Sequence, residues 1–222
     1  MLDLDILAFT DFHGQRDAFS QARKLILSDR PDLVVVAGDL VNHDAEHAKQ
    51  MLLQLAEANR PVYFVPGNMD APALADWTGT EQVHPLHGRC LQVYEVSLLG
   101  LGGSPVGAFK FPFGFTEQHA ATLLDNLAED CHGDNMILVS HCPPRNTKID
   151  RIHSGEHVGS ISVREFVEKA RPLLVISGHI HEAQGMDSIG VTTVVNIGAA
   201  EHGCFARISI SDTVVTSFNR FV

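Results

Sequence analysis

The sequence predicts an α/β fold whose central strands run parallel and alternate with helices. Short apolar runs without polar interruptions recur along the chain, and such runs are typical of strands that are covered on both faces of a sheet. Segments with the apolar spacing of amphipathic helices separate the first three runs, and this alternation indicates parallel strands joined by helical crossovers. Hydrophobic residues make up 45% of the chain and charged residues 19%, which suits a large packed core.

The first part of the chain contains three of these strands and two helices. The strands are expected at residues 4–10, 33–37 and 62–65, and the helices at residues 16–29 and 44–58. In the first helix, Phe19, Ala22 and Ile26 share one face, so that this face can pack on the sheet.

The second part of the chain is less regular. We expect a hairpin with strands at residues 92–96 and 98–101, helices at residues 117–130 and 162–170, and buried strands at residues 136–139 and 173–176. Three further strands are expected at residues 192–197, 205–210 and 214–218. The last three alternate apolar and polar residues, which predicts antiparallel strands with one face in water. The parallel and antiparallel portions are therefore expected to form two packed layers.

One domain covering residues 1–222 is expected, because no repeat, low-complexity stretch or linker marks a boundary. The chain carries 16 Lys and Arg against 27 Asp and Glu, a net charge of −11, which argues against a clamp for long nucleic acids or a protein that binds acidic membranes. Asp3 and Asp5 stand where a signal peptide would carry positive charge. We therefore expect a cytoplasmic protein. The sequence predicts no particular oligomeric state.

The four cysteines are far apart and form no Cys-x-x-Cys pair: Cys90, Cys131, Cys142 and Cys204. This spacing indicates neither a thiolate zinc site nor a disulfide framework, so we expect buried or incidental thiols. The 13 histidines are more informative, because many stand beside Gly or Asp at the ends of apolar runs. Metal sites draw their ligands from such positions.

Five of the apolar runs end in turns rich in metal-ligating residue types. The residues concerned are Asp11, His13, Asp39, Asn68, His141, His179 and His181. Any one of these turns alone is more typical of an ordinary surface turn. In open α/β sheets, however, the carboxyl ends of the strands meet at one crevice, so the five turns are expected to converge.

The residue types and their spacing predict a metal centre. In extended chain, residues two apart point the same way, so Asp11 with His13, and His179 with His181, can each aim two side chains into one cavity. Carboxylate, amide oxygen and imidazole together suit Mn²⁺ first, with Fe, Zn²⁺, Ni²⁺ and Co²⁺ as alternatives, more than Ca²⁺. Seven ligands exceed the needs of one ion, whereas two ions about 3.5–4 Å apart that share one carboxylate would use them all.

The ordered set D-x-H, G-D, G-N, H and G-H-x-H, spread from Asp11 to Gly198, resembles the calcineurin-like metallophosphoesterases, in particular the Icc-related predicted phosphoesterases of prokaryotes. The resemblance implies two mixed β-sheets flanked by helices, an αββα sandwich. It also implies that one metal is held by Asp11, His13, Asp39 and His181. The other metal is implied to be held by Asp39, Asn68, His141 and His179, with Asp39 as the bridge.

The implied activity is hydrolysis of small phosphate esters. The charge of two divalent ions exceeds that of Asp11 and Asp39, so the site stays positive and attracts phosphate. A metal-bound hydroxide would attack phosphorus, with phosphodiesters as the main substrates and nucleotides or activated monoesters as further ones. The alternatives are a catalytically weak or inactive metal-binding or interaction scaffold, as the resemblance implies for the retromer subunit of this fold, and another metallohydrolase chemistry at the same ions.

One position departs from the family pattern. The family commonly has G-N-H followed by an acid, with the imidazole near the leaving group, but this chain has Met69 between Asn68 and the acid, Asp70. A thioether cannot donate a proton, which favours phosphodiesters or activated esters as substrates. His157 is the predicted substitute donor and His153 a second candidate, although both are equally expected to be solvated loop residues. Asp70 is expected to support the metal ligands without binding a metal itself.

A loop over residues 104–115 carries alternating aromatic residues: Phe109, Phe111, Phe113 and Phe115. A substrate lid and a hairpin packed on the sheet would both account for this pattern. Packing is favoured, because alternating aromatic residues are common in strands.

Overall fold

The computed structural model describes residues 2–107, 110–131 and 135–221, and its first six-stranded sheet carries the parallel strands of the first half of the chain. The strand order is β14-β13-β1-β2-β3-β4, in which β1 to β4 are parallel and β13 is antiparallel to β1 and to β14. These strands are β1 (Leu4–Phe9), β2 (Leu33–Val36), β3 (Val62–Phe64), β4 (Val83–Pro85), β13 (Cys204–Ile210) and β14 (Val214–Arg220).

The second six-stranded sheet has the order β11-β12-β10-β9-β6-β5, in which β6, β9, β10 and β12 are parallel. Its strands are β5 (Cys90–Val93), β6 (Val96–Leu101), β9 (Met136–Ser140), β10 (Leu174–Ser177), β11 (Gly185–Ile189) and β12 (Thr192–Asn196). A separate two-stranded sheet pairs β7 (Ser104–Pro105) with β8 (Gly114–Phe115).

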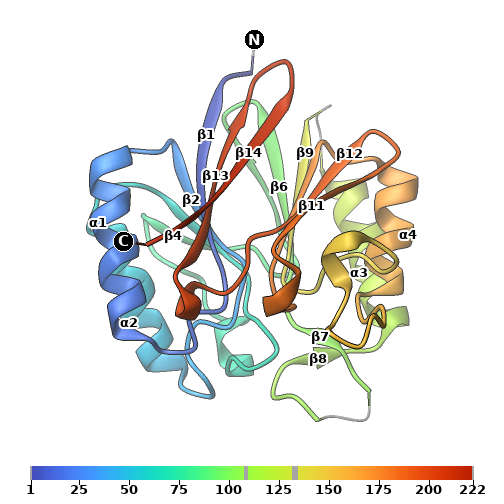
Figure 1. Cartoon of the computed structure of the whole chain (residues 1–222), viewed down its shortest axis with the longest axis horizontal. Helices are drawn as coiled ribbons and strands as arrows, with labels where there is room; N and C mark the ends of the chain where they lie inside the picture. The colour runs from blue at the N-terminus through green and yellow to red at the C-terminus, as the bar shows by residue number, and fades with distance from the viewer. Residues whose placement is uncertain (1, 108–109, 132–134, 222) are drawn as a thin grey trace.

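Helices cover the outer faces of both sheets (Figure 1). The first sheet is covered by α1 (Arg16–Asp29) and α2 (Ala45–Ala56), and the second by α3 (Glu117–Asp130) and α4 (Ile161–Ala170). Short 3₁₀ helices lie in the turns of the described part: η1 (Pro72–Leu74), η2 (Lys148–Asp150), η3 (His181–Ala183) and η4 (Ala200–His202). The expected pair of mixed sheets flanked by helices, the αββα sandwich, is confirmed.

The unbroken apolar runs are explained by burial on both sides of each sheet. Along β1, Ile6 and Ala8 face the layer between the two sheets, whereas Leu7 and Phe9 face α1 and α2. All four side chains are at most 2% exposed. Because each face of the strand meets a different apolar layer, no alternation of polar residues is left in the sequence.

Two expectations for the C-terminal part are corrected. The expected antiparallel strand at residues 192–197 is confirmed only in part: β12 pairs antiparallel with β11, but it runs parallel to β10 on its other side and has no wet face. Its antiparallel partner β11 was not expected, because the run Gly185-Met186-Asp187-Ser188 lacks the apolar character of a buried strand. As an edge strand, β11 is half-buried and tolerates this composition.

The expectation that no cysteines pair is also wrong. Cys90 in β5 and Cys131 at the end of α3 form a disulfide, with their Cα atoms 5.9 Å apart. The two residues are 41 positions apart in sequence, and only the packing of α3 beside β5 brings them together, so no local spacing could signal the bond. Cys142 and Cys204 are free and buried, as expected.

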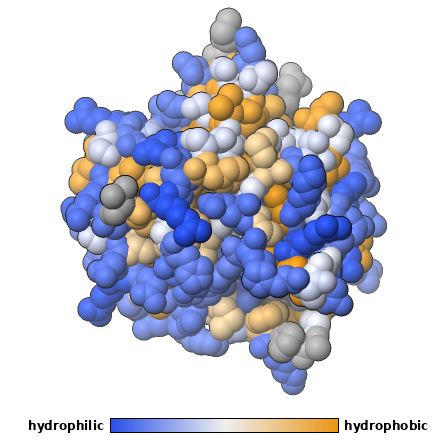
Figure 2. Space-filling model, viewed as in Figure 1, coloured by the Kyte–Doolittle hydropathy of each residue, from blue (hydrophilic) through white to orange (hydrophobic). Residues whose placement is uncertain are grey.

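The outer surface is mostly polar on the face drawn in Figure 2, where hydrophilic residues dominate and apolar residues form small scattered patches. The large exposed apolar side chains include Val191, Val215 and Tyr94, which lie in or beside different strands. Within the described ranges, no helix has the length and apolar character needed to cross a membrane.

Candidate metal centre

The turns that follow β1, β2, β3, β9 and β10 lie against one another at one edge of the sandwich. Backbone hydrogen bonds join them: the Asp11 N–H donates to the Gly38 carbonyl at 2.9 Å, and the His13 N–H donates to the Asp39 carbonyl at 2.9 Å. From the second sheet, the Gly178 N–H donates to the His141 carbonyl at 3.0 Å. The convergence predicted from strand order is therefore present in the structure.

One group of side chains gathers around Asp11. Nε2 of His181 lies 3.4 Å from Asp11 Oδ1 and 3.3 Å from Nε2 of His13. Nε2 of His13 is also 3.7 Å from Asp39 Oδ2. These nitrogen and oxygen atoms converge closely enough for one ion to contact several of them.

A second group lies on the other side of Asp39. Nε2 of His141 is 3.7 Å from Asp39 Oδ2 and 2.8 Å from the side-chain oxygen of Asn68. The ring of His179 packs beside that of His141, with centroids 5.0 Å apart. Asp39 therefore stands between the two groups, and all seven predicted ligand residues lie in one cluster.

Each carboxylate uses one oxygen to accept hydrogen bonds from the surrounding turns and has the other oxygen facing histidines. Asp11 Oδ2 accepts from the Thr10 hydroxyl at 2.8 Å and the His179 N–H at 2.9 Å, whereas Asp11 Oδ1 is buried without a hydrogen-bond partner among the described residues. Asp39 Oδ1 accepts from the Met69 N–H at 2.8 Å, which leaves Oδ2 toward His13 and His141. A buried acceptor without a donor is costly, and a bound cation would satisfy it.

Burial and charge set the protonation of the cluster. Burial, together with the neighbouring His141, lowers the pKa of His179 to about 3, so this ring is neutral and keeps a free lone pair. Burial alone would raise the pKa of Asp11, but its contacts with His181 and His141 hold it below the usual range. Burial raises the pKa of Asp39. Contact with Asp11 raises the pKa of His181, so this ring differs from that of His179. A divalent transition metal binds the neutral form of each imidazole beside the carboxylates.

Four of the seven residues have left-handed backbone conformations. The φ angles of Asp11, His13, Asp39 and His179 are 53°, 47°, 51° and 69°. Non-glycine residues adopt this region at a cost of about 1–3 kcal/mol each and keep it only where the surroundings enforce it. Such strain is typical of functional sites, and here it occurs in the turns whose side chains gather around Asp11 and Asp39.

Comparison with known proteins identifies the family. The model of the calcineurin-like phosphoesterase family matches residues 4–183, which include all seven cluster residues. The chain belongs to the calcineurin-like phosphoesterases. An uncharacterized protein of Methanocaldococcus jannaschii is 31% identical over 199 residues, which are 87% of each chain.

Solved structures show the calcineurin-like phosphoesterase fold over the whole length. A protein of Thermus thermophilus superposes with a TM-score of 0.79 at 20% identity, covering 100% of both chains. An archaeal phosphodiesterase superposes with a TM-score of 0.56 at 15% identity, covering 97% of this chain and 100% of that one. At these identities the likeness concerns the fold alone, whereas the family match supports a phosphoric ester hydrolase.

Asp70 lies behind the cluster. It is fully buried, and its carboxylate accepts from the backbone N–H groups of Leu40, Val41 and Gly67 at 3.2, 3.0 and 2.8 Å. Burial and the nearby Asp39 raise the pKa of Asp70 to about 7. The contacts fasten the turn after β2 to the turn after β3, so Asp70 supports the positions of Asp39 and Asn68.

The structure gives the predicted proton donor other partners. Nδ1 of His157 lies 2.6 Å from the buried Asp150 carboxylate, and its Nε2 accepts from the Arg151 side chain at 3.2 Å. The backbone N–H of His153 donates to Glu182 at 3.1 Å, and its ring is exposed. Neither ring is among the groups that meet around Asp11 and Asp39. The catalytic role of His157 stays a prediction, and its contacts favour a structural one.

The aromatic loop lies beside the cluster. The ring of Phe111 meets that of His179 edge-on, with centroids 6.5 Å apart, and Phe113 packs in the same way on His87 at 5.0 Å. The Phe113 N–H donates to the Asn68 carbonyl at 3.2 Å, which fastens the loop to a predicted ligand residue. The favoured packing on the sheet is confirmed for Phe115, which is buried in the apolar cluster between the second sheet and its helices, whereas Phe109 lies outside the described residues.

Sequence reasoning missed two polar neighbours of the histidines. The side-chain oxygen of Asn42 lies 3.0 Å from Nδ1 of His13, and Glu201 Oε1 lies 3.3 Å from Nδ1 of His181. Asn42 lies three residues after Asp39 in the segment that follows β2, and this nearness in sequence is the signal that could have indicated it. Glu201 comes from η4, which no pattern predicted.

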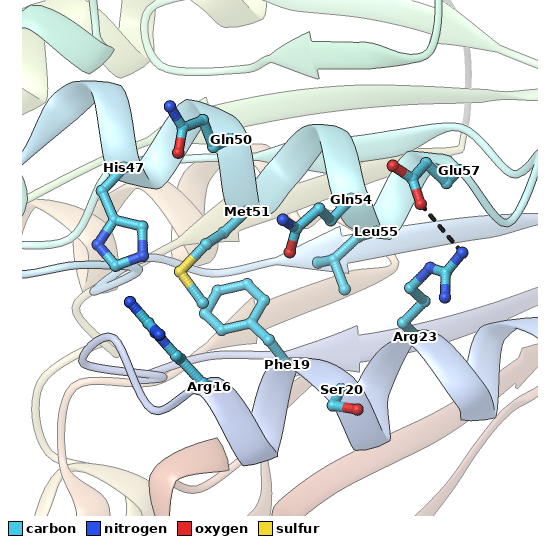
Figure 3. Close-up of a pocket in the computed structure, with 10 residues that line it drawn as sticks. All are labelled: Arg16, Phe19, Ser20, Arg23, His47, Gln50, Met51, Gln54, Leu55 and Glu57. Atoms are coloured by element: carbon cyan, nitrogen blue, oxygen red, sulfur yellow. Dashed lines mark ion pairs between the residues drawn. The ribbon is translucent and has the colours of Figure 1, made fainter.

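A groove elsewhere on the surface holds none of the predicted ligands. It lies between α1 and α2, has a volume of about 480 Å³, and is drawn in Figure 3. Phe19, Met51 and Leu55 form its apolar part, and an ion pair of 3.0 Å joins Arg23 to Glu57 across it. We assign no chemistry to this groove.

Proposed function

We propose that this chain is a dinuclear metal-dependent phosphoesterase that hydrolyses small phosphodiesters, with nucleotides and activated monoesters as further substrates. The observation that carries the proposal is the place of Asp39, whose Oδ2 lies 3.7 Å from Nε2 of both His13 and His141. One carboxylate oxygen between two sets of imidazoles is the arrangement that a pair of ions sharing a ligand needs.

The residues that would hold the ions fall into the two groups described above. One ion would take Asp11, His13, Asp39 and His181, and the other Asp39, Asn68, His141 and His179. Mn²⁺ suits this mixed set of oxygen and nitrogen donors, and Fe, Zn²⁺, Ni²⁺ and Co²⁺ are the alternatives. Bound divalent ions supply Lewis acidity, which activates water and stabilises negative charge on phosphoryl oxygens.

The chain's own residues set the rest of the chemistry. Asp11 and Asp39 bring two negative charges to a cluster with a neutral His179, so with ions bound the site stays positive and binds a phosphate group. Met69 lies beside Asn68 and is half-buried, and it has no proton to give to a leaving group. Esters whose leaving groups depart without protonation are therefore the preferred substrates. The similarity in fold to an archaeal phosphodiesterase is consistent with a phosphodiester substrate.

The test is replacement of the shared carboxylate. Asp39→Asn keeps the shape of the side chain and removes the charge, and Asp17→Asn removes an exposed carboxylate on α1 as a matched control. We expect Asp39→Asn to lose bound manganese, measured by elemental analysis, and turnover of an aryl phosphodiester with Mn²⁺ present. Wild-type occupancy and turnover in Asp39→Asn would refute the proposal. A wild-type protein that binds manganese but cleaves neither a diester nor a monoester would favour the scaffold function.

We propose the cytoplasm as the compartment. Disulfides are rare in the cytosol of most organisms, so this placement carries the expectation that Cys90 and Cys131 are reduced in the cell. Alkylation of both thiols in freshly opened cells would support it, and a bond that is complete before any exposure to air would contradict it.

A further inference from the structure

Two histidines of the cluster, His141 and His181, have an oxygen atom close to Nδ1, the ring nitrogen that points away from the carboxylates. Nδ1 of His141 lies 2.7 Å from the Ala37 carbonyl oxygen, and Nδ1 of His181 lies 3.3 Å from Glu201 Oε1. In both rings, Nε2 is the atom that faces the carboxylates of the cluster. A carbonyl or carboxylate oxygen can only accept, so the oxygen at Nδ1 favours a hydrogen on that nitrogen. The carboxylates that face Nε2 are acceptors as well, so a free lone pair on Nε2 depends on the acceptor at Nδ1.

We propose that Glu201 is a positioning residue of the metal centre, which holds His181 in the tautomer and ring orientation that leave its Nε2 free to bind a cation. The inference rests on the function proposed above and adds a residue to it from the last 3₁₀ turn of the chain. An oxygen that accepts from the second ring nitrogen of a metal-binding histidine fixes the tautomer and the orientation of the ring.

Glu201 is itself fixed by the site. Its backbone N–H donates to the Asp11 carbonyl at 3.1 Å, and the Ala200 N–H donates to the Thr10 carbonyl at 2.9 Å. The turn that carries the carboxylate is therefore bonded to the turn that carries Asp11. The side chain of Glu201 is 21% exposed, so solvent screens its interaction with His181 only in part. A residue in a surface loop without a role in the site would need no such attachment.

His181 depends on this acceptor more than His141 does. The ring of His141 is fully buried and its Nδ1 contacts a main-chain carbonyl, which no side-chain change removes. The ring of His181 is 30% exposed, and Glu201 is the acceptor nearest its Nδ1 among the interactions described. Without Glu201, a neutral ring can carry its hydrogen on Nε2, which removes the lone pair that a cation needs.

The first experiment measures the tautomer without any metal. Nitrogen-15 spectra of the histidine side chains of the metal-free protein, at a pH that leaves the rings neutral, report which ring nitrogen carries the hydrogen. We expect the hydrogen of His181 to favour Nδ1 in the wild type and in Glu201→Gln, whose amide oxygen still accepts, and to move toward Nε2, which faces Asp11, in Glu201→Ala. Glu182→Ala is the matched control, because Glu182 lies beside His181 in η3 but accepts from the His153 N–H.

The second experiment measures affinity for Co²⁺ alone by calorimetry and visible absorption. We expect Glu201→Ala to weaken binding by about 10–100-fold, with Glu201→Gln and Glu182→Ala close to wild type. An unchanged tautomer in Glu201→Ala, or an equal loss of affinity in Glu201→Gln, would overturn the inference, since the latter would make Glu201 a direct ligand. If the wild type binds no Co²⁺, the proposed function fails, whereas the tautomer spectra still decide whether Glu201 orients His181.

Discussion

Gly67 shows how closely the backbone approaches the cluster. A Cβ atom placed on this residue would overlap the backbone nitrogen and the Oδ1 atom of Asp39. Asp39 cannot move away easily, because its Oδ1 accepts from Met69 and its backbone is already left-handed. The absence of a side chain at Gly67 therefore lets two turns of the site meet.

Gly67→Ala should both destabilise the protein and disrupt the site. Overpacking of a tight contact costs about 1–3 kcal/mol, so we expect a fall of that size in the free energy of unfolding, measured with urea, together with weaker Mn²⁺ binding. Gly107→Ala is the control, since a Cβ there meets no atom of the described residues within 4 Å. Equal stability of the two variants would show that the turns around Asp39 can rearrange.

Met69→His tests the missing proton donor. General-acid help is worth about 10²–10⁴-fold in typical enzymes, and it matters most for leaving groups of high pKa. We expect Met69→His to raise kcat/KM for an alkyl phosphate ester by at least about tenfold and to change an activated aryl ester little. The same gain for both esters, or none for either, would mean that protonation of the leaving group does not limit this enzyme.

Single residues differ in how far the sequence could predict them. The seven cluster residues carry a signal because each follows an apolar run, and their convergence follows from parallel strands alone. Asn42 and Glu201 carry no comparable signal, since the contact between a carboxyl or amide group and the outer nitrogen of a histidine depends on loop paths. The Cys90–Cys131 bond was not predicted either, because it depends on the packing of α3 beside β5.

At the scale of elements, Glu117 joins two helices on the outer face of the second sheet. It begins α3, and its carboxylate accepts from the Ile161 N–H at 2.9 Å and the Ser162 N–H at 3.0 Å at the start of α4. The hydroxyl groups of Ser160 and Ser162 donate to it at 2.7 and 2.6 Å. The carboxylate thus satisfies N–H groups at the α4 terminus, where negative charge is favourable.

Glu117→Gln should lower stability in a pH-dependent way. Burial would raise the pKa of Glu117, but the hydrogen bonds from Ser162, Ser160 and Ile161 hold it below its ordinary value of 4.5. A lowered pKa contributes stability above the unfolded-state value, and this stability is lost as the pH falls through the folded-state value. We expect a loss of about 2 kcal/mol at pH 7 that shrinks below pH 4.5, measured by urea unfolding.

A surface ion pair on α4 provides the contrast. Arg164 and Glu168 lie 2.6 Å apart, one helical turn from each other, and both are partly exposed. Such pairs contribute about 0.3–0.5 kcal/mol, so Glu168→Gln should change the free energy of unfolding far less than Glu117→Gln. A pH-independent loss in Glu117→Gln would indicate that shape rather than charge holds the two helices together.

Elements with strong periodicity were predicted closely. α1 and α3 begin and end at the expected residues, because their apolar faces pack on the sheets and polar residues occupy the remaining positions. The short strands β4 and β11 were not predicted, because three to five residues of mixed polarity show no clear hydrophobic periodicity. The direction of β12 could not be derived from its own pattern, because it depends on which strand lies next to it.

At the scale of the whole molecule, the cluster lies where the two sheets meet. Asp11, Asp39 and Asn68 follow strands of the first sheet, whereas His141 and His179 follow strands of the second. The layer between the sheets consists of apolar side chains, and hydrophobic interactions have no preferred direction. Their packing therefore sets the distance between the sheets but provides few directional bonds. Ions held by ligands from both sides would add directional links between the two halves.

Metal binding should therefore stabilise the entire fold. A ligand that binds only the folded state adds about 2.7 kcal/mol to the free energy of unfolding at a free concentration 100 times its Kd. We expect the Tm to rise with Mn²⁺ concentration and to return to the metal-free value with a chelator, as followed by calorimetry. In Asp39→Asn the increase should vanish, whereas Asp17→Asn should keep it. A Tm that is insensitive to Mn²⁺, Zn²⁺ and Co²⁺ in the wild type would contradict a metal link between the sheets.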